Sequence, residues 1–465
     1  MNKTYGVCLG VFVIGLVGLG APASQARGRS IAAESSGWSE TTAASEASAT
    51  TAATEASTTE LDTQLAAKKE EAPDLPADVK LQDQGAPAPA TPPPAAAPAA
   101  AAPMPLPTPS MSGPLATGLP HEVPAGPFGK IEVTGILSGI GLFGNNPFFT
   151  GDEGHVDLSN AQVFIQKTSG VFQFYLQGGA YNLPAVGVPF GKTIDNVKGL
   201  YGPFPVGYVK LVKGNFNIEI GALPTVIGDE YTFTFENMNV ERGLLWGQEP
   251  AISRGIQLND TYKKLTVAFS WNDGFYSNRY TSLSGSLAFA INAANTITFA
   301  GSGNAGNAYA PTCTTLLCAT PFNQNNSEVF NLIYTYTKGN LIISPYYQYT
   351  YVPTKAGIPI GAATTGGALL ANYNFKHGLS LAVRPEYVKS NGSLATGAPN
   401  LLGYGPGSGA FSFTVTPNWV KDAFFLRGDV SVVHITSGTP GAEFGINGGT
   451  NTNQVRGVIE AGFLF

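Results

Sequence analysis

Charged side chains are rare in this 465-residue chain, and among the long connections after residue 128 the most charged one lies between residues 223 and 254. Only 12% of all residues are charged, yet this stretch holds five carboxylates and two guanidinium groups. Charges confined in one loop can impose a field on ions that pass through a narrow aqueous path. The carboxylates lack the Asp-x-Asp-x-Asp-Gly spacing of a calcium loop, so we predict no metal site. The seven residues are Asp229, Glu230, Glu236, Glu241, Arg242, Glu249 and Arg254.

The histidines offer no catalytic arrangement. His121, His155, His377 and His434 are far apart, and no His-Glu-x-x-His, Gly-x-Ser-x-Gly, P-loop or dinucleotide motif occurs. His434 follows Ser431 by three residues, but residues at this spacing on a strand point to opposite faces. We therefore predict neither an enzyme nor a cofactor.

The elements that must position these charges alternate in character with a period of two. In the last residues of the chain, Phe463 and Phe465 fall on an apolar face, and Arg456 and Glu460 fall on the opposite face. This alternation is typical of a strand between lipid and an aqueous lumen. A charge that faces lipid near the midplane costs about 2–4 kcal/mol, so the charged face must point inward.

The same parity places further charges on the inner face of other segments. Opposite charges on that face predict a wetted lumen rather than a packed core. The predicted lumen-wall residues are Lys210, Glu219, Arg384, Glu386, Arg427, Asp429, Arg456 and Glu460. The six arginines after residue 128 are scattered over strands and loops, so no arginine cluster is predicted.

Sixteen strand-like segments follow Gly129, and short turns alternate with long loops rich in Gly, Asn, Pro and Ser. This organisation predicts an all-β fold, a transmembrane antiparallel up-and-down β-barrel of about 16 strands. Weak patterning between residues 281 and 302 leaves fourteen or eighteen strands open. A β-sandwich would need a polar outer face, and a solenoid would show a fixed repeat. Pro345, Pro385 and Pro417 fall inside predicted strands, where we expect bulges or shifted boundaries. The expected starts are Lys130, Val156, Val171, Val206, Asn215, Arg254, Lys264, Tyr280, Thr296, Ser327, Asn340, Thr364, Gly378, Ser408, Asp422 and Asn453.

The front of the chain differs in composition. Residues 1–26 have the basic start, apolar core and small residues of a cleaved secretory signal, and Cys8 precedes that core, which disfavours a lipoprotein. Residues 27–127 form a low-complexity Ser/Thr/Ala and then Ala/Pro-rich segment, predicted to be a disordered periplasmic linker, and residues 128–465 form the barrel. The net charge of −6 lies in residues 1–127, and nothing basic indicates nucleic acid. Cys313 and Cys318 are expected to form a local disulfide in an oxidising compartment, with two free thiols as the alternative.

The strand count, loop order and terminal aromatic residue resemble Gram-negative outer-membrane porins. The layout, with segments such as Arg254-Gly255-Ile256-Gln257-Leu258 and Trp271-Asn272-Asp273-Gly274, is similar to the OmpL-like porin group over residues 128–465. This resemblance implies an outer-membrane location, contact with outer-membrane lipid, and insertion by the barrel assembly machinery with Phe463 and Phe465 as the C-terminal signal. It also implies a third loop, about residues 223–253, that folds into the lumen, and a homotrimer by analogy. The alternative for the loop is that it packs over the mouth.

Two functions follow as hypotheses. The first is a porin that forms a water-filled channel for passive diffusion of small polar solutes and ions, constricted by the third loop. The second is a structural or adhesive barrel tethered to peptidoglycan through the N-terminal arm. The third loop and Arg254 together carry a charge of −3, which predicts a mild cation preference that weakens as salt rises.

Overall fold

The computed structural model describes residues 115, 120–149, 152–305, 328–354, 358, 360–446 and 449–465. The chain divides into two units, Met1–Thr91 and Pro92–Phe465, and all described residues belong to the second. The signal peptide, most of the Ala/Pro-rich linker, Cys313 and Cys318 lie outside the described residues. The predictions about them, including the tether to peptidoglycan, stay predictions.

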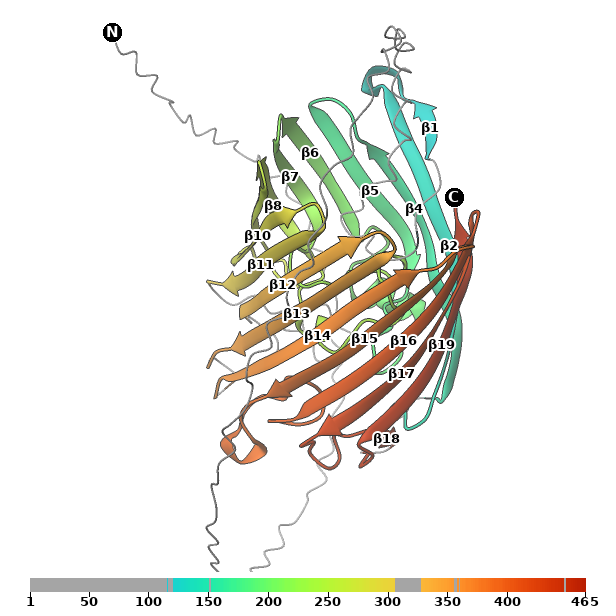
Figure 1. Ribbon diagram of the computed structural model, residues 1–465. Coiled ribbons are helices and arrows are strands. Elements are labelled where there is room, and N and C mark those ends of the chain that lie inside the picture. Colours follow the sequence, from blue (N-terminus) through green and yellow to red (C-terminus); the bar gives the residue numbers. More distant parts are fainter. Residues whose placement is uncertain are drawn as a thin grey trace, which may run out of the picture. The chain divides into compact units, whose positions relative to one another are not determined.

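Sixteen antiparallel strands form a closed barrel, because β19 pairs with β2 and every other strand pairs with its neighbours along the chain (Figure 1). Each strand begins within two residues of its predicted start. The strands are β2 (Lys130–Gly144), β4 (Gly154–Lys167), β5 (Phe172–Tyr181), β6 (Val206–Lys213), β7 (Phe216–Pro224), β8 (Ile252–Tyr262), β9 (Leu265–Asn272), β10 (Ser282–Asn292), β11 (Asn295–Asn304), β12 (Glu328–Lys338), β13 (Leu341–Val352), β14 (Ala362–Asn374), β15 (Leu379–Ser390), β16 (Gly409–Lys421), β17 (Phe424–Thr436) and β19 (Asn453–Leu464).

Short strands, a short helix and 3-10 turns lie in the connections between the barrel strands and before β2. A parallel bridge joins β3 (Phe148–Phe149) to β18 (Gly445–Ile446), and a short helix, α1 (Thr193–Gly199), follows β5. The described residues also contain four 3-10 turns: η1 (Gly126–Phe128), η2 (Thr234–Glu236), η3 (Trp246–Gln248) and η5 (Leu394–Thr396). The turns η2 and η3 lie in the same long loop. No helix in the described part of the chain is both long enough and apolar enough to span a membrane.

The barrel begins earlier than residue 128. A short strand, β1 (His121–Pro124), pairs with residues 130–133 of β2 and occupies the position next to the end of β19. Residues 121–124, which the sequence placed in the linker, therefore pair with the first strand of the barrel. Composition misassigned them because a four-residue strand is too short to show a period.

The two faces of the strands follow the predicted parity. In β19, Arg456 and Glu460 are buried on the inner side, whereas Phe463 is 53% exposed on the outer side. The Phe465 ring lies over Gly135, where an added Cβ would be only 2.5 Å from the ring. The backbone N–H of Phe465 also donates to the Gly135 carbonyl (2.9 Å), so the last residue helps to close the barrel.

The prolines are accommodated without the expected bulges. Pro345, Pro385 and Pro417 lie in the middle of β13, β15 and β16 on the outward-facing parity. Beside each proline, the pairing with one neighbouring strand lapses for two residues and resumes in the same register, while the pairing with the other neighbour is continuous. Proline removes one N–H from the ladder, and here that loss is local because the other edge holds the register.

Candidate functional site: the loop between β7 and β8

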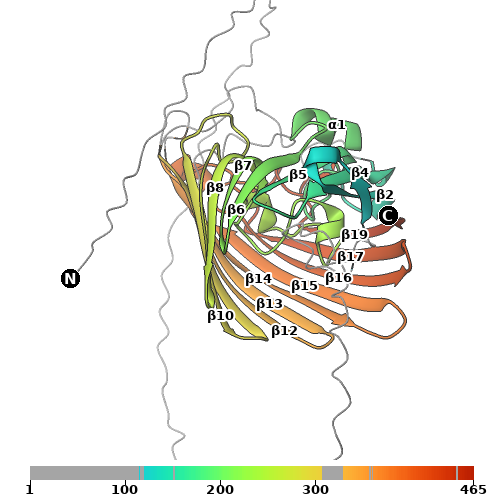
Figure 2. The ribbon, with the colours of Figure 1, turned by 90° about the horizontal axis from the view of Figure 1, so that it is seen from above.

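The loop of residues 225–251 reaches from β7 and β8 to the inner faces of β15, β17 and β19, within the curve of the strands (Figure 2). Its residues from Thr232 to Leu245 are all buried. Its own side chains fold it: Glu236 accepts from the Phe233 N–H (3.0 Å), and Asn237 donates to the Phe233 carbonyl (2.8 Å). Phe233 also stacks on Phe235 with ring centroids 5.9 Å apart. The loop is thus a compact body before any contact with the wall is counted.

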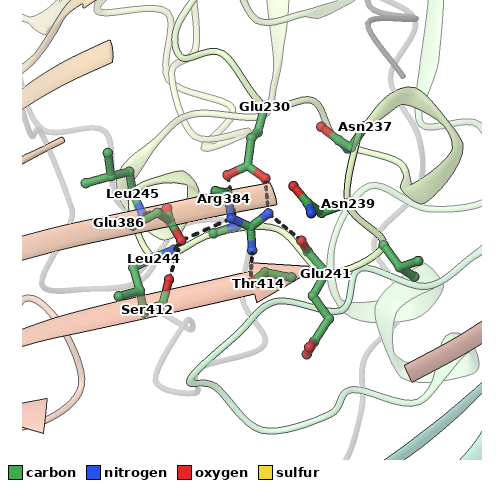
Figure 3. Close-up of polar contacts among 12 residues, drawn as sticks. Glu230, Asn237, Asn239, Glu241, Leu244, Leu245, Arg384, Glu386, Ser412 and Thr414 are labelled. Atoms are coloured by element: carbon green, nitrogen blue, oxygen red, sulfur yellow. Dashed lines mark hydrogen bonds and ion pairs between the residues drawn. The ribbon is translucent and has the colours of Figure 1, made fainter. Parts of the chain in front are cut away.

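Arg384, on β15, is the centre of the contact between loop and wall (Figure 3). Its Nη1 lies 2.6 Å from Oε1 of Glu230 and donates to the Glu241 carbonyl (2.7 Å), both in the loop. On the wall it donates to Glu386 (3.1 Å) and to Thr414 (3.3 Å). Its side chain is fully buried, so these bonds replace all of its hydration.

Glu386 binds the backbone of the loop. Its carboxylate accepts from the Leu244 N–H (3.1 Å) and from the Ser412 hydroxyl (2.6 Å). Gly243 permits this approach, because a Cβ there would lie 2.0 Å from a Glu386 oxygen. Any side chain at residue 243 would therefore push the loop away from the wall.

A second arginine holds the loop further along. Arg427, on β17, donates to the carbonyl oxygens of Thr234 and Asn237, each at 2.9 Å. Its Nη1 lies 3.6 Å from Glu460, and Glu460 in turn accepts from the Thr234 hydroxyl (2.7 Å) and from Asn160 (3.2 Å). The buried ion pair of Arg427 and Glu460 therefore binds the η2 turn at both of its ends, Thr234 and Asn237.

The third arginine contact involves Glu241. Arg456, on β19, donates to Oε1 of Glu241 (3.1 Å), and Ser431 donates to Oε2 of the same residue (2.9 Å). Asp429 accepts from the N–H groups of Val240 (3.1 Å) and Glu241 (2.7 Å). The loop therefore meets the wall through charges of both signs.

Strand register explains why arginines that are distant in sequence act together. Arg384 is paired across the sheet with Thr414, which is paired with Ser431, which is paired with Arg456. Arg384 and Arg456 therefore lie at one level of the barrel wall. Register, and not sequence distance, therefore lets both arginines reach the same loop, although three strand spacings, about 14 Å, separate them.

The same contacts correct the expectation of a wetted lumen on this side. Six of the eight predicted wall residues lie against the loop or bond to a residue that does, and all six are almost fully buried. They are Arg384, Glu386, Arg427, Asp429, Arg456 and Glu460. The interior is packed there because a loop supplies partners that a parity argument cannot foresee.

Three predicted residues lie elsewhere. Arg254 bonds to Asp273 (2.8 Å) and lies over the Tyr276 ring at 3.9 Å, so its contacts are with the β9–β10 connection and not with the charged loop. Lys210 and Glu219 pair at 2.9 Å and border a cavity of about 590 Å³ on the short-turn side of the loop.

Not every loop charge has a partner. Among the described residues, the guanidinium nitrogens of fully buried Arg242 and the carboxylate oxygens of Glu249 have no hydrogen-bond partner. Arg242 lies 5.2 Å from the centre of the Trp246 ring, and burial lowers its pKa to about 10. Burial raises the pKa of Glu249 well above its usual value and that of Asp229 to about 7. The charge of the loop therefore changes near neutral pH.

The opposite wall consists of small side chains. The inward positions of β9, β10 and β11 carry Ser, Ala and Thr, with Asn272 and Asn304 at the ends of β9 and β11. The sequence does not single these residues out, because they carry no charge and residues 281–302 are weakly patterned. The neutral partners of the loop, such as Thr414, Ser431 and Asn160, are likewise not singled out, because they carry no charge.

Ser431 and His434 point to opposite faces of β17, as their spacing predicts. Ser431 is buried inside, bonded to Glu241, whereas His434 is exposed and lies 2.8 Å from Asn453. Among the described residues, no cluster of His, Cys, Asp and Glu side chains is arranged to hold a metal ion.

Comparison with protein families assigns this barrel. The family described as "Putative beta-barrel porin-2, OmpL-like" matches residues 130–465. The chain belongs to this family. It is an outer-membrane porin by family and by architecture.

Solved structures agree on the fold. The anion-selective porin from Comamonas acidovorans has 12% identity and a TM-score of 0.50, over 72% of this chain and 99% of that one. In-vitro folded OmpT, an outer-membrane protein of Vibrio cholerae, has 10% identity and a TM-score of 0.50, over 74% of this chain and 100% of that one. A search of curated proteins found no match. At these identities, the likeness extends to the fold alone.

Proposed function

We propose that this porin is a passive-diffusion channel for small polar solutes and ions, and that the loop of residues 225–251 narrows its lumen. The observation that carries the proposal is the asymmetry of the interior. The loop is bonded to the charged wall of β15, β17 and β19. The facing wall of β9–β11 has mostly small, uncharged inward side chains, and the loop packs against it where Ile227 meets Ala300. Solutes would pass between the loop and the wall of small residues.

Planar-bilayer recording of the purified barrel tests the channel. Stepwise ion conductance is expected, and a folded protein that inserts and never conducts would contradict the proposal. Replacing residues 232–245 with a short Gly/Ser linker tests the constriction separately. This change should raise the conductance of each step, whereas an unchanged step size would mean that the loop does not limit the path.

The charge around the loop supports a cation preference. The loop and the wall that it contacts hold eight carboxyl groups against four guanidinium groups, since Arg254 is paired elsewhere, and the carboxylates stay in excess when Glu249 and Asp229 are protonated. The carboxylates are Asp229, Glu230, Glu236, Glu241, Glu249, Glu386, Asp429 and Glu460, and the guanidinium groups belong to Arg242, Arg384, Arg427 and Arg456. Such a field acts over about 10 Å at 0.1 M salt, so the preference should weaken as salt rises. The reversal potential across a salt gradient measures it, and anion preference in the wild type would refute it.

A further inference from the structure

The cavity of about 590 Å³ next to Lys210 and Glu219 differs in chemistry from the charged loop above it. It lies between residues 224–231 at the start of the loop and the short-turn halves of the strands from β4 to β12. Its volume is within the range of small-molecule sites, about 300–1,000 Å³.

The charges that border this cavity largely cancel or are occupied. The Lys210 ammonium and the Glu219 carboxylate neutralise each other at 2.9 Å. Lys167 donates to the backbone carbonyls of Ser169 and Phe172 (3.0 Å for Phe172). The fourth charge on the lining is Asp229, whose pKa is raised to about 7 by burial, so two ammonium groups face one full and one partial carboxylate charge near neutral pH. A charged solute would therefore find no cluster of charges of one sign here.

Neutral amides form a ladder along the β7–β8 wall of the cavity. Gln257 donates to Asn259 (2.9 Å), and Asn259 donates to Asn217 (2.9 Å). A primary amide has two N–H donors and an oxygen that accepts twice, so this ladder leaves several donors and acceptors for a solute. An apolar solute would strip water from these amides without replacing its hydrogen bonds, which is unfavourable.

Aromatic rings adjoin the amides. Tyr175 and Tyr208, on β5 and β6, stack with centroids 5.6 Å apart and planes inclined by 27°, and both line the cavity. Tyr231, from the loop, lines it as well. Aromatic faces beside neutral donors and acceptors suit a ring that has C–H groups on its faces and hydroxyl groups at its edge.

We propose that this cavity binds an uncharged, polyhydroxylated solute of monosaccharide to disaccharide size as it passes through the channel. The inference rests on the proposed channel function and adds a solute class to it. The amide ladder would bond the hydroxyl groups, and the Tyr175–Tyr208 pair would contact the ring.

Sucrose is a suitable probe, with polyethylene glycol of similar mass as the reference. Sucrose added on the short-turn side should reduce the ion current in a saturable way, whereas the polymer should reduce it only in proportion to viscosity. Asn259→Ala and Tyr208→Leu should each weaken the sucrose effect by roughly tenfold, the equivalent of one or two lost contacts. Val209→Ala, on the lipid-facing parity of the same strand, is the matched control and should leave it unchanged.

Calorimetric titration of the folded, detergent-solubilised protein with sucrose separates the two proposals. Conductance without sucrose binding, or binding that survives both Asn259→Ala and Tyr208→Leu, would overturn the solute site alone. Binding without conductance would overturn the channel function alone. Heat-modifiable gel mobility establishes that each variant is folded.

Discussion

Replacing Arg384 with methionine should release the loop from the barrel wall. The variant loses the two bonds that Arg384 makes to the loop, to Glu230 at 2.6 Å and to the Glu241 carbonyl at 2.7 Å. It also leaves the Glu230 and Glu386 carboxylates buried without their guanidinium. Removing one partner of a buried ion pair typically costs about 3–5 kcal/mol. At about 1.4 kcal/mol per tenfold, the population of released loop should rise by a factor between roughly 10² and 4 × 10³.

Single-channel recording detects this change, because a loop that leaves the wall and returns modulates the current. Arg384→Met should show larger and noisier conductance steps than the wild type, with heat-modifiable mobility retained since the strands are intact. Arg254→Met is the matched control. It also removes the ion-pair partner of a buried carboxylate, that of Asp273, but the side-chain hydrogen bonds of Arg254 are made to Asp273 and Tyr276 and not to residues 225–251. Its current noise should stay near the wild-type level.

The double variant Glu230→Gln/Arg384→Met sharpens the test. It removes one of the two stranded carboxylates as well as the guanidinium, so its loop should be held better than in Arg384→Met alone. Wild-type steps and noise in Arg384→Met, or equal effects of Arg384→Met and Arg254→Met, would refute the role assigned to this arginine.

Three further outcomes are expected. Burial raises the pKa of Asp229 to about 7, so this carboxyl group gains its charge as pH rises, and cation preference should increase from about pH 6 to about pH 8. Asp229→Asn should reduce this pH dependence of the reversal potential, and an unaltered profile would count against the prediction. Glu241→Gln leaves the Arg456 guanidinium without its carboxylate at 3.1 Å and should shift the reversal potential toward anions; no shift would mean that this pair lies off the ion path. Phe465→Asp places a charge on the lipid-facing parity beside Gly135 and should lower the yield of folded barrel in outer membranes, with wild-type yield as the contrary result.

The sequence by itself determined the strands, their faces and their connections. These depend on local properties: a period of two assigns each side chain to lipid or lumen, and turn residues end each strand. The inward position of Arg384 and Glu460 and the outward position of Phe463 were therefore readable without coordinates. The charge-rich loop was visible for the same reason, since composition alone distinguishes it.

Only the tertiary structure decided what each charge contacts. Arg384 and Arg456 lie in one row of paired residues that crosses four strands. The pairing of each strand with the next sets this row, and no local sequence pattern predicts it. The partner of Glu241 lies 215 residues away, and Arg254 turned to Asp273 instead of the loop. Contacts between a folded loop and a closed sheet depend on three-dimensional packing. The charged residues were therefore identifiable from the sequence, whereas their ion-pair partners were identifiable only from the structure.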